Sequence, residues 1–130
     1  YISTDGGSYV STDNLRTVSN LSLKGLNISQ YYTTYTHREK TQIIYVGSQD
    51  QGFQRSTEIT DGVANFEQTI SGDYGHIVSS DGGQSLWTVY PGFAMRYPNA
   101  ISSLQTVRWT FTGEDHYWMP PLMADPYYQP

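Results

Sequence analysis

The sequence predicts an all-β fold, and three observations support this prediction. Apolar positions do not recur at the three- and four-residue spacing of a helix over any long window without a Gly, a Pro or a β-branched cluster intervening. Short apolar segments alternate with turn residues at close to the spacing of about 8–12 residues that is typical of sandwiches, barrels and propellers. Much of the apolar content is Tyr, 12 residues in all, whose ring with a polar tip suits a strand that has one wet face.

Strands are expected in chain order wherever a short apolar segment is bounded by turn residues. The expected strands cover residues 31–36, 42–46, 53–56, 66–70, 76–80, 85–90, 93–97 and 106–111. Gly beside or near Asp marks the turns, because Gly takes positive φ at little cost and Asp can accept hydrogen bonds from its own backbone. The turn residues identified in this way are Asp5, Asp50, Asp61 and Asp81.

An internal repeat indicates how the strands are grouped. Residues 42–56 are echoed by residues 85–97, since each copy is an apolar strand, a Gly turn and a strand in which Arg follows an aromatic residue. The copies are separated by about 40 residues, the length of one four-stranded propeller blade. The repeat therefore predicts two four-stranded antiparallel blades of a β-propeller, over residues 27–72 and 73–112.

The two ends of the sequence are expected to be parts of neighbouring blades. Residues 1–26 are interpreted as the end of one blade, and residues 113–130, which include Trp118 to Pro126, as the start of another. A propeller ring takes about 4–8 blades, so two blades alone would leave bare strand edges. The partners expected are therefore the remaining blades of the same propeller or other protein chains.

A short motif near the start resembles the Asp box, which runs Ser/Thr-x-Asp-x-Gly-x-Thr-Trp. The segment Ser11-Thr12-Asp13-Asn14-Leu15-Arg16-Thr17-Val18 keeps the Ser, Asp and Thr, whereas Leu15 replaces the Gly and Val18 replaces the Trp. Residues 56–62 together with Phe66 look like a second, stretched version of the same motif.

Three further phrases extend the resemblance over most of the chain. Ser79-Ser80-Asp81-Gly82-Gly83 with Trp87 has the spelling of an Asp box but a different strand position. Gly47-Ser48-Gln49-Asp50-Gln51-Gly52 is similar to Gly-Thr-Gln-Asp-Asn-Gly, and residues 71–75 are similar to Gly-Gly-Asp-Gly. On these residues the chain resembles the Asp-box (bacterial neuraminidase repeat) β-propellers of the sortilin-like and xyloglucanase-like branch, which occur in large secreted bacterial proteins.

The resemblance implies a structural role for the Asp residues of these motifs. In the family the Asp box folds the chain back between the third and fourth strands of a blade, and its carboxylate accepts hydrogen bonds from turn amides. Asp5, Asp13, Asp61 and Asp81 are therefore expected to stabilise turns, and no residue is assigned as catalytic. The resemblance also implies an extracellular or cell-surface location, because the proteins it points to are exported.

Charge and composition exclude several classes of function. With 12 acidic and 7 basic residues the formal net charge is -5, so the surface does not attract a phosphate backbone and nucleic acid is not expected as a partner. No apolar run approaches the roughly 20 residues of a membrane-spanning helix. The sequence has no Cys and no cofactor-binding motif, so no cofactor is expected, and whether a metal binds is left open.

Four polar residues in turns are the best candidates for a binding site. Gln49, Asp50, Asp73 and His76 lie in turns that a propeller would place at one rim, where propellers usually bind ligands or ions. The alternative is that they only cap turns. The dense polar cluster Glu114-Asp115-His116 is interpreted as an exposed loop rather than a metal or acid–base site.

The function expected is that of a non-catalytic extracellular propeller segment that serves as a platform for protein or glycan partners. One alternative is part of a secreted glycoside hydrolase of the xyloglucanase or sialidase type, with its catalytic carboxylates mostly contributed by other blades. Another is a sortilin-like receptor that binds peptides inside the central tunnel. All three depend on analogy with the family, since fold alone does not fix function.

Overall fold

The computed structural model describes residues 1–5, 7–22, 29–113, 115–125 and 127. They form two compact units, Tyr1–Gln30 and Tyr31–Pro130. The described residues contain strands and turns without a helix, and all pairings between strands are antiparallel. The prediction of an all-β chain with two four-stranded antiparallel sheets is confirmed.

The first unit is a small three-stranded sheet. Its strands are β1 (Ile2–Thr4), β2 (Gly7–Val10) and β3 (Ser19–Asn20), which lie side by side in chain order. Asp5 lies in the turn between β1 and β2, and the longer connection from β2 to β3 contains Asp13.

The second unit begins with a four-stranded sheet, called the first sheet below. Its strands are β4 (Tyr31–Thr36), β5 (Ile44–Ser48), β6 (Gly52–Ser56) and β9 (Glu67–Ile70), again neighbours in chain order. Between β6 and β9 the chain forms a separate two-stranded hairpin of β7 (Ile59–Thr60) and β8 (Val63–Ala64).

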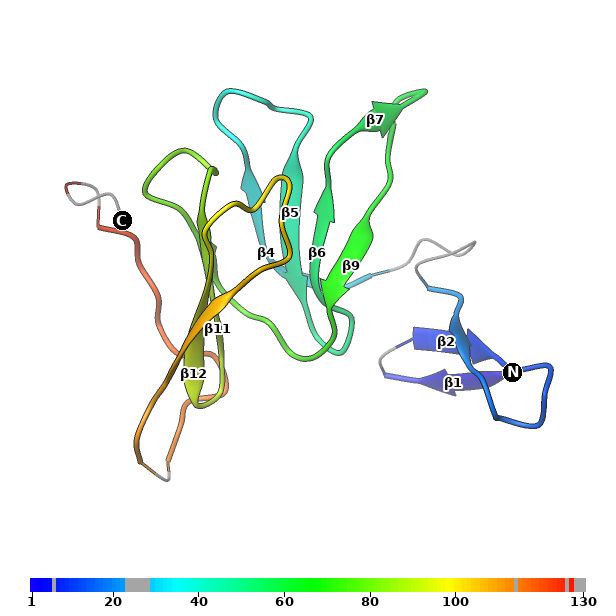
Figure 1. Cartoon of the computed structure of the whole chain (residues 1–130). Coiled ribbons are helices and arrows are strands. Elements are labelled where there is room, and N and C mark those ends of the chain that lie inside the picture. The colour runs from blue at the N-terminus through cyan, green and yellow to red at the C-terminus, as the bar shows by residue number, and fades with distance from the viewer. Residues whose placement is uncertain (6, 23–28, 114, 126, 128–130) are drawn as a thin grey trace. The chain divides into compact units, whose positions relative to one another are not determined.

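The second sheet has the same order of four antiparallel strands (Figure 1). It consists of β10 (Ile77–Val78), β11 (Leu86–Tyr90), β12 (Phe93–Tyr97) and β13 (Val107–Thr110). Each strand returns directly beside the previous one, so both sheets are simple up-and-down meanders.

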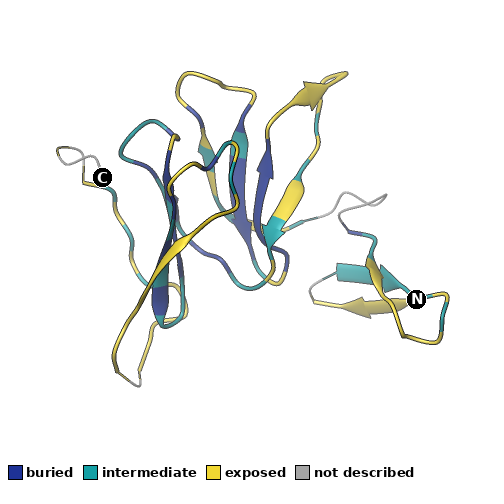
Figure 2. Ribbon diagram, viewed as in Figure 1, coloured by how far each residue is buried: buried dark blue, intermediate teal, exposed yellow. Residues whose placement is uncertain are grey.

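The two sheets share one core, which Figure 2 shows as the dark blue central strands of each sheet. Side chains alternate between the faces of a strand, so every second residue of β5, β6, β11 and β12 can point into this core. The Phe53 and Tyr97 rings stack at 4.7 Å across the interface. The buried cluster comprises Ile43, Tyr45, Phe53, Tyr74, Ile77, Leu86, Phe93, Met95, Tyr97 and Ala100.

Hydrogen bonds between the sheets fix their packing. The Arg55 guanidinium donates from Nη1 to the Ala100 carbonyl at 2.8 Å, and the Tyr45 hydroxyl donates to the Gly83 carbonyl at 3.3 Å. Burial raises the pKa of Tyr45 to about 12, and it does the same to Tyr97. The interface therefore combines apolar packing with a few specific polar contacts, as buried polar groups require.

The C-terminal segment, residues 117–125, runs along the side of the second sheet that is turned away from the first sheet (Figure 1). The strand expected to begin near Trp118 is not present, because residues 115–125 form no strand. Exposure nevertheless alternates along it: Leu122 and Ala124 are half-buried, whereas Met123 and Asp125 are exposed. The segment is thus placed like a strand, but it has no partner strand in the described part of the chain to complete a ladder.

Candidate functional site

Three of the four predicted site residues meet at one end of the first sheet. Gln49 and Asp50 lie in the loop between β5 and β6, and Asp73 lies in the segment that leads to the second sheet. The Tyr32 hydroxyl donates to Gln49 Oε1 at 2.8 Å, and Asp73 Oδ1 accepts from the Asp50 amide at 3.0 Å. Asp50 has a φ of 58°, a left-handed conformation that Asp tolerates better than most residues.

These contacts connect the loop to the segment between the sheets. A bridge pairs Gln51 with Gly72, and the Tyr74 amide donates to the Ser48 carbonyl at 3.2 Å. Because the Asp73 carboxylate already accepts a backbone amide, it holds the connection in place. His76 is half-buried directly before β10, and the described contacts do not bring it to the other three. The described residues also contain no group of three or more His, Cys, Asp or Glu that could hold a metal ion.

The Asp13 and Asp81 motifs form the same hydrogen-bonded turn. In each motif the Ser two residues before the Asp donates to Asp Oδ1, at 2.9 Å from Ser11 and 2.8 Å from Ser79. That Ser Oγ also accepts the amide four residues later, from Leu15 at 2.9 Å and from Gly83 at 2.8 Å.

The second half of each turn is also the same. The residue four positions after the Asp donates both its amide and its hydroxyl to the carboxylate. Thr17 does so to Asp13 at 2.9 and 2.6 Å, and Ser85 does so to Asp81 with shortest distances of 2.9 and 2.7 Å. Both carboxylates therefore accept turn donors, which is a structural use of Asp.

The hydrogen bonds set the charge state of the two carboxylates. Bonds from the Thr17 hydroxyl and amide lower the pKa of Asp13 below its ordinary value of 3.8. Burial has the largest single effect on Asp81 and raises its pKa, but the bonds from Ser85, Ser79 and Gly83 together outweigh burial and leave that pKa below 3.8. Both groups are anionic near neutral pH, as acceptors of several N–H and O–H donors should be.

The other two motif residues lie in ordinary turns. Asp61 and Gly62, with φ values of 52° and 78°, join β7 to β8 as a tight two-residue hairpin turn. The stretched Asp box expected over residues 56–62 is not formed, because the Ser56 hydroxyl donates to the Glu58 carbonyl at 2.9 Å instead of to Asp61. Asp81 lies between the first two strands of its sheet, β10 and β11.

The described cavity lies on the outer face of the second sheet, which sequence reasoning did not single out. The outer face is defined by the side chains of Val78, Trp87, Arg96, Val107 and Trp109, which neighbour one another across the four strands. The Trp87 and Trp109 rings stack at 4.9 Å, and the Arg96 guanidinium lies 5.8 Å from the centre of the Trp87 ring.

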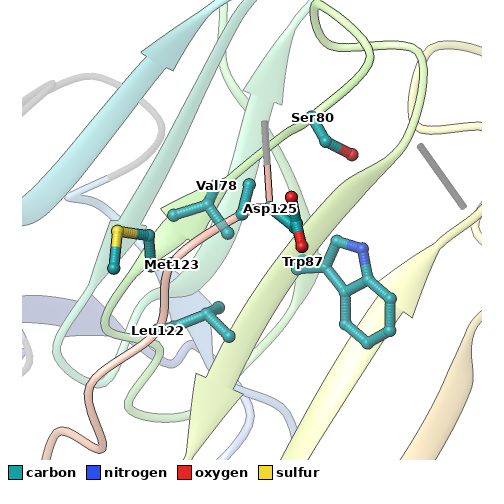
Figure 3. Close-up of a pocket in the computed structure, with 7 residues that line it drawn as sticks. Val78, Ser80, Trp87, Leu122, Met123 and Asp125 are labelled. Atoms are coloured by element: carbon teal, nitrogen blue, oxygen red, sulfur yellow. The ribbon is translucent and has the colours of Figure 1, made fainter. Parts of the chain in front are cut away.

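The cavity has a volume of about 240 Å³ and opens between this face and the C-terminal segment. Figure 3 shows Leu122 and Asp125 of that segment beside Val78 and Trp87 of the sheet. The lining residues are Val78, Ser80, Trp87, Leu122, Met123, Ala124 and Asp125. The lining is mainly apolar with one carboxylate, so the cavity suits an apolar group better than a reacting sugar held between two facing acids.

A sequence signal for this face exists but needs the strand register. Trp87 and Trp109 lie in two predicted strands, but the sequence does not show that their side chains share a face. The register shows it: Ala94 pairs with both Val89 and Trp109, and Val89 lies two residues after Trp87, on the same face of β11. Arg96 is three residues after Phe93, whereas Arg55 is two residues after Phe53. The two Phe–Arg phrases of the repeat therefore differ by one residue, which places Phe93 and Arg96 on opposite faces of β12.

Comparison of the chain with protein-family models, with curated proteins and with solved structures finds no match. Among the described residues, no helix has the length and apolar character needed to cross a membrane. The identity that can be stated is structural: an all-β protein built from small antiparallel sheets, two of them four-stranded and packed on one core.

Proposed function

We propose that the chain is a stretch of about two blades of a secreted β-propeller and acts at the cell surface as a non-catalytic platform for protein or glycan partners. The observation that carries this proposal is the equivalence of the two sheets. Tyr45 pairs with Arg55 between the middle strands of the first sheet, and Trp87 pairs with Arg96 at the same place in the second sheet. Propellers repeat one four-stranded meander in this manner.

The face of the first sheet that carries Arg55 and the face of the second sheet that carries Arg96 also point in the same direction. Arg55 and Tyr45 lie on the face of the first sheet that contacts the second sheet, through Ala100 and Gly83. Arg96 and Trp87 lie on the face of the second sheet that is turned away from the first. Such a head-to-tail order can continue from sheet to sheet, whereas two sheets of a closed sandwich would bury equivalent faces against each other.

The path of the chain after each sheet supports the same interpretation. After β9 the chain crosses the first sheet, where the Tyr74 amide meets the Ser48 carbonyl, and then forms β10. After β13 the C-terminal segment crosses the second sheet in a comparable way, with Met119 beside Gly75 and Leu122 beside the cavity. After each sheet, the chain thus crosses the face of that sheet that carries the equivalent Arg.

The polar residues favour a structural platform over an active site. Asp13 and Asp81 accept turn amides and hydroxyls, and Asp73 accepts the Asp50 amide. Carboxylates engaged in this way hold loops rigid, and rigid loops on a sheet scaffold are suited to recognition by shape.

The proposal can be tested on the native protein. Antibodies raised against this chain would isolate it from its source cells, and negative-stain electron microscopy should then show a ring of radiating blades. A compact particle without a ring would overturn the propeller assignment. On intact cells, the same antibodies should bind at the surface, and labelling only after lysis would contradict the location.

The absence of catalysis has its own assay. The isolated protein is expected to leave xyloglucan and sialylated oligosaccharides intact during long incubations, with products followed by mass spectrometry. If the protein does cleave either substrate, and if substitution of one of its carboxylates abolishes the cleavage, the platform function is wrong and the protein is a glycoside hydrolase.

A further inference from the structure

We propose that the outer face of the second sheet is a docking surface for an antiparallel β-sheet of a partner polypeptide. The partner inserts a large apolar side chain into the 240 Å³ cavity and presents a backbone carbonyl to Arg96. This inference rests on the equivalence of the two sheets used above, but it does not require that the assembly close into a ring.

The first sheet shows how an equivalent face is covered. Residues 76–101 lie across it and supply both kinds of contact: the fully buried Leu86 side chain belongs to the core that includes Tyr45, and the Ala100 carbonyl accepts from Arg55. The occupant of that face is therefore a sheet with an apolar strand and a following loop whose carbonyl is free to accept a hydrogen bond.

Arg96 is positioned for the same contact but lacks the partner. Arg55 Nε donates to Glu67 Oε2 at 3.2 Å, while its Nη1 reaches the next sheet. The residue that pairs with Arg96 in the same place is Val107, which offers no acceptor. Arg96 Nε is buried and has no hydrogen-bond partner in the described part of the chain. In the first sheet the acceptor for Arg55 Nε belongs to the same sheet, and the contact with the next sheet is made from Nη1, so the carbonyl expected from a partner is the acceptor for an Nη group of Arg96.

The remaining surface has the composition of an interface. Trp109 and Val107 are each 44% exposed beside the half-buried Trp87, so the face presents stacked aromatic rings, an aliphatic side chain and one Arg. Trp and Arg are the residues most enriched at the centres of protein interfaces.

The probe for this docking surface is a synthetic polypeptide with the sequence of residues 76–101, the segment that covers the equivalent face of the first sheet. The probe carries Trp87→Phe, so that the signal comes from the full chain alone. Titrated against the full chain up to millimolar concentration, it should bind saturably and change the fluorescence of the chain's own Trp87 and Trp109. In a second arm the same sequence is joined to the C-terminus by a flexible Gly/Ser linker, which raises its effective concentration to about the millimolar range. Hydrogen exchange should then slow in β13.

Matched variants of the full chain locate the contact. Leu122→Asp places a charge in the cavity lining and should abolish binding, whereas Leu104→Asp, the same change at a side chain that is 51% exposed in a loop, should leave binding intact. Arg96→Met should weaken binding about tenfold, because one charge-assisted hydrogen bond is lost.

The outcomes separate this inference from the proposed function. Absence of saturable binding in the first arm together with absence of protection in the tethered arm overturns the docking surface, even if the native protein proves to be a ring. Equal loss of binding in the Leu122→Asp and Leu104→Asp variants would also overturn it. Binding that depends on Leu122 and Arg96 supports it, even if no ring is seen.

Discussion

The turns around Asp13 and Asp81 have the same hydrogen bonds but different surroundings. In the first unit, Leu15 and Val18 beside Asp13 are 63% and 51% exposed. In the second unit, Gly83 packs on His37, the Arg38 amide donates to the Gly82 carbonyl at 2.9 Å, and Leu86 is fully buried. The residues of the motif are thus sufficient to form the turn, while its contribution to stability depends on what packs against it.

Backbone strain separates the same two turns. Asn14 and Leu15 have φ values of 57° and 64°, where the second turn has Gly82 and Gly83 at 75° and 104°. A side chain at such angles costs about 1–2 kcal/mol, and Gly avoids that cost. The exposed turn thus tolerates a strained Leu, whereas the packed turn has no room for one, since a Cβ on Gly83 would lie 3.1 Å from the His37 Cα atom.

Alkaline pH should give the largest difference between the two turns, because the Asp81 turn is joined to buried phenols. The pKa of Tyr45 is raised from 10.0 to about 12, as is that of Tyr97, so folding favours the protonated phenols. Their stabilisation is complete below pH 10, falls as the pH rises toward 12, and amounts to about 3 kcal/mol each by the free energy of a two-unit shift.

Urea unfolding followed by Trp fluorescence between pH 9 and 12 measures this loss, since the three Trp residues all lie in the second unit. Tyr45→Phe should flatten part of the pH dependence. A free energy of unfolding that stays constant over this range would contradict the burial of the two phenols.

Truncation of the apolar residue that follows each turn should give the next largest difference. Leu86→Ala empties a fully buried site and should cost about 3 kcal/mol of unfolding free energy in the second unit. Val18→Ala, at a side chain that is 51% exposed, should change stability by less than about 0.5 kcal/mol. Urea unfolding measures the loss in the second unit, and hydrogen exchange measures it in the first unit. Equal losses of stability in the two variants would mean that packing does not distinguish the turns.

Removal of the carboxylate should reveal a smaller difference. Asp81→Ala leaves the buried Ser85 and Ser79 donors without their acceptor and should cost about 1–2 kcal/mol near neutral pH. Asp13→Ala should cost less, because water can replace the lost bonds at an exposed turn.

Acid tests the same carboxylates without substitution. Because the folded pKa of each Asp is lowered, its stabilisation is present above the ordinary value of 3.8 and is lost as the pH falls through the folded pKa. Stability of the second unit should therefore drop below pH 3.8, and this part of the drop should be absent in Asp81→Ala.

Exchange of the strained residue should give the smallest effect. Leu15→Gly relieves the left-handed Leu but increases the entropy of the unfolded chain, so the net gain should be below about 1 kcal/mol. Gly83→Ala is the reciprocal change and should destabilise the second unit. Hydrogen exchange of β2 and β3 measures the first change, and a clear loss of stability in Leu15→Gly would show that the Leu side chain contributes more than its strain costs.

Most strands of the second unit were predictable because their side-chain period is local. Residues 31–36 and 93–97 were placed with their observed bounds, as β4 and β12. The strand expected over residues 76–80 shortens to Ile77–Val78 because Ser79 leaves the ladder to bond Asp81 and the Gly83 amide. The sequence did not predict strands β1, β2 and β3 or the short hairpin of β7 and β8, because each has too few residues to display a period.

The candidate site was predictable only in part. Turn residues Gln49, Asp50 and Asp73 do meet, but through contacts with Tyr32 and the backbone that local spacing does not specify. His37 lies in a polar segment with Arg38, Glu39 and Lys40, yet its ring is buried and Nδ1 accepts the amides of Glu39 and Lys40 at 3.2 Å each. Only the packing of the second sheet on that loop decides its burial.

Local sequence was enough for most strands of the second unit, the tight turns and the two Asp turns, because each depends on side chains within a few residues of one another. The tertiary structure decided which face of each strand is covered, since a shift of one residue, as between the two Phe–Arg phrases, moves a side chain to the other face. It also decided that Arg55 finds an acceptor and that Arg96 Nε does not. That outcome depends on a carbonyl and a carboxylate contributed by distant strands and loops, which no local pattern encodes.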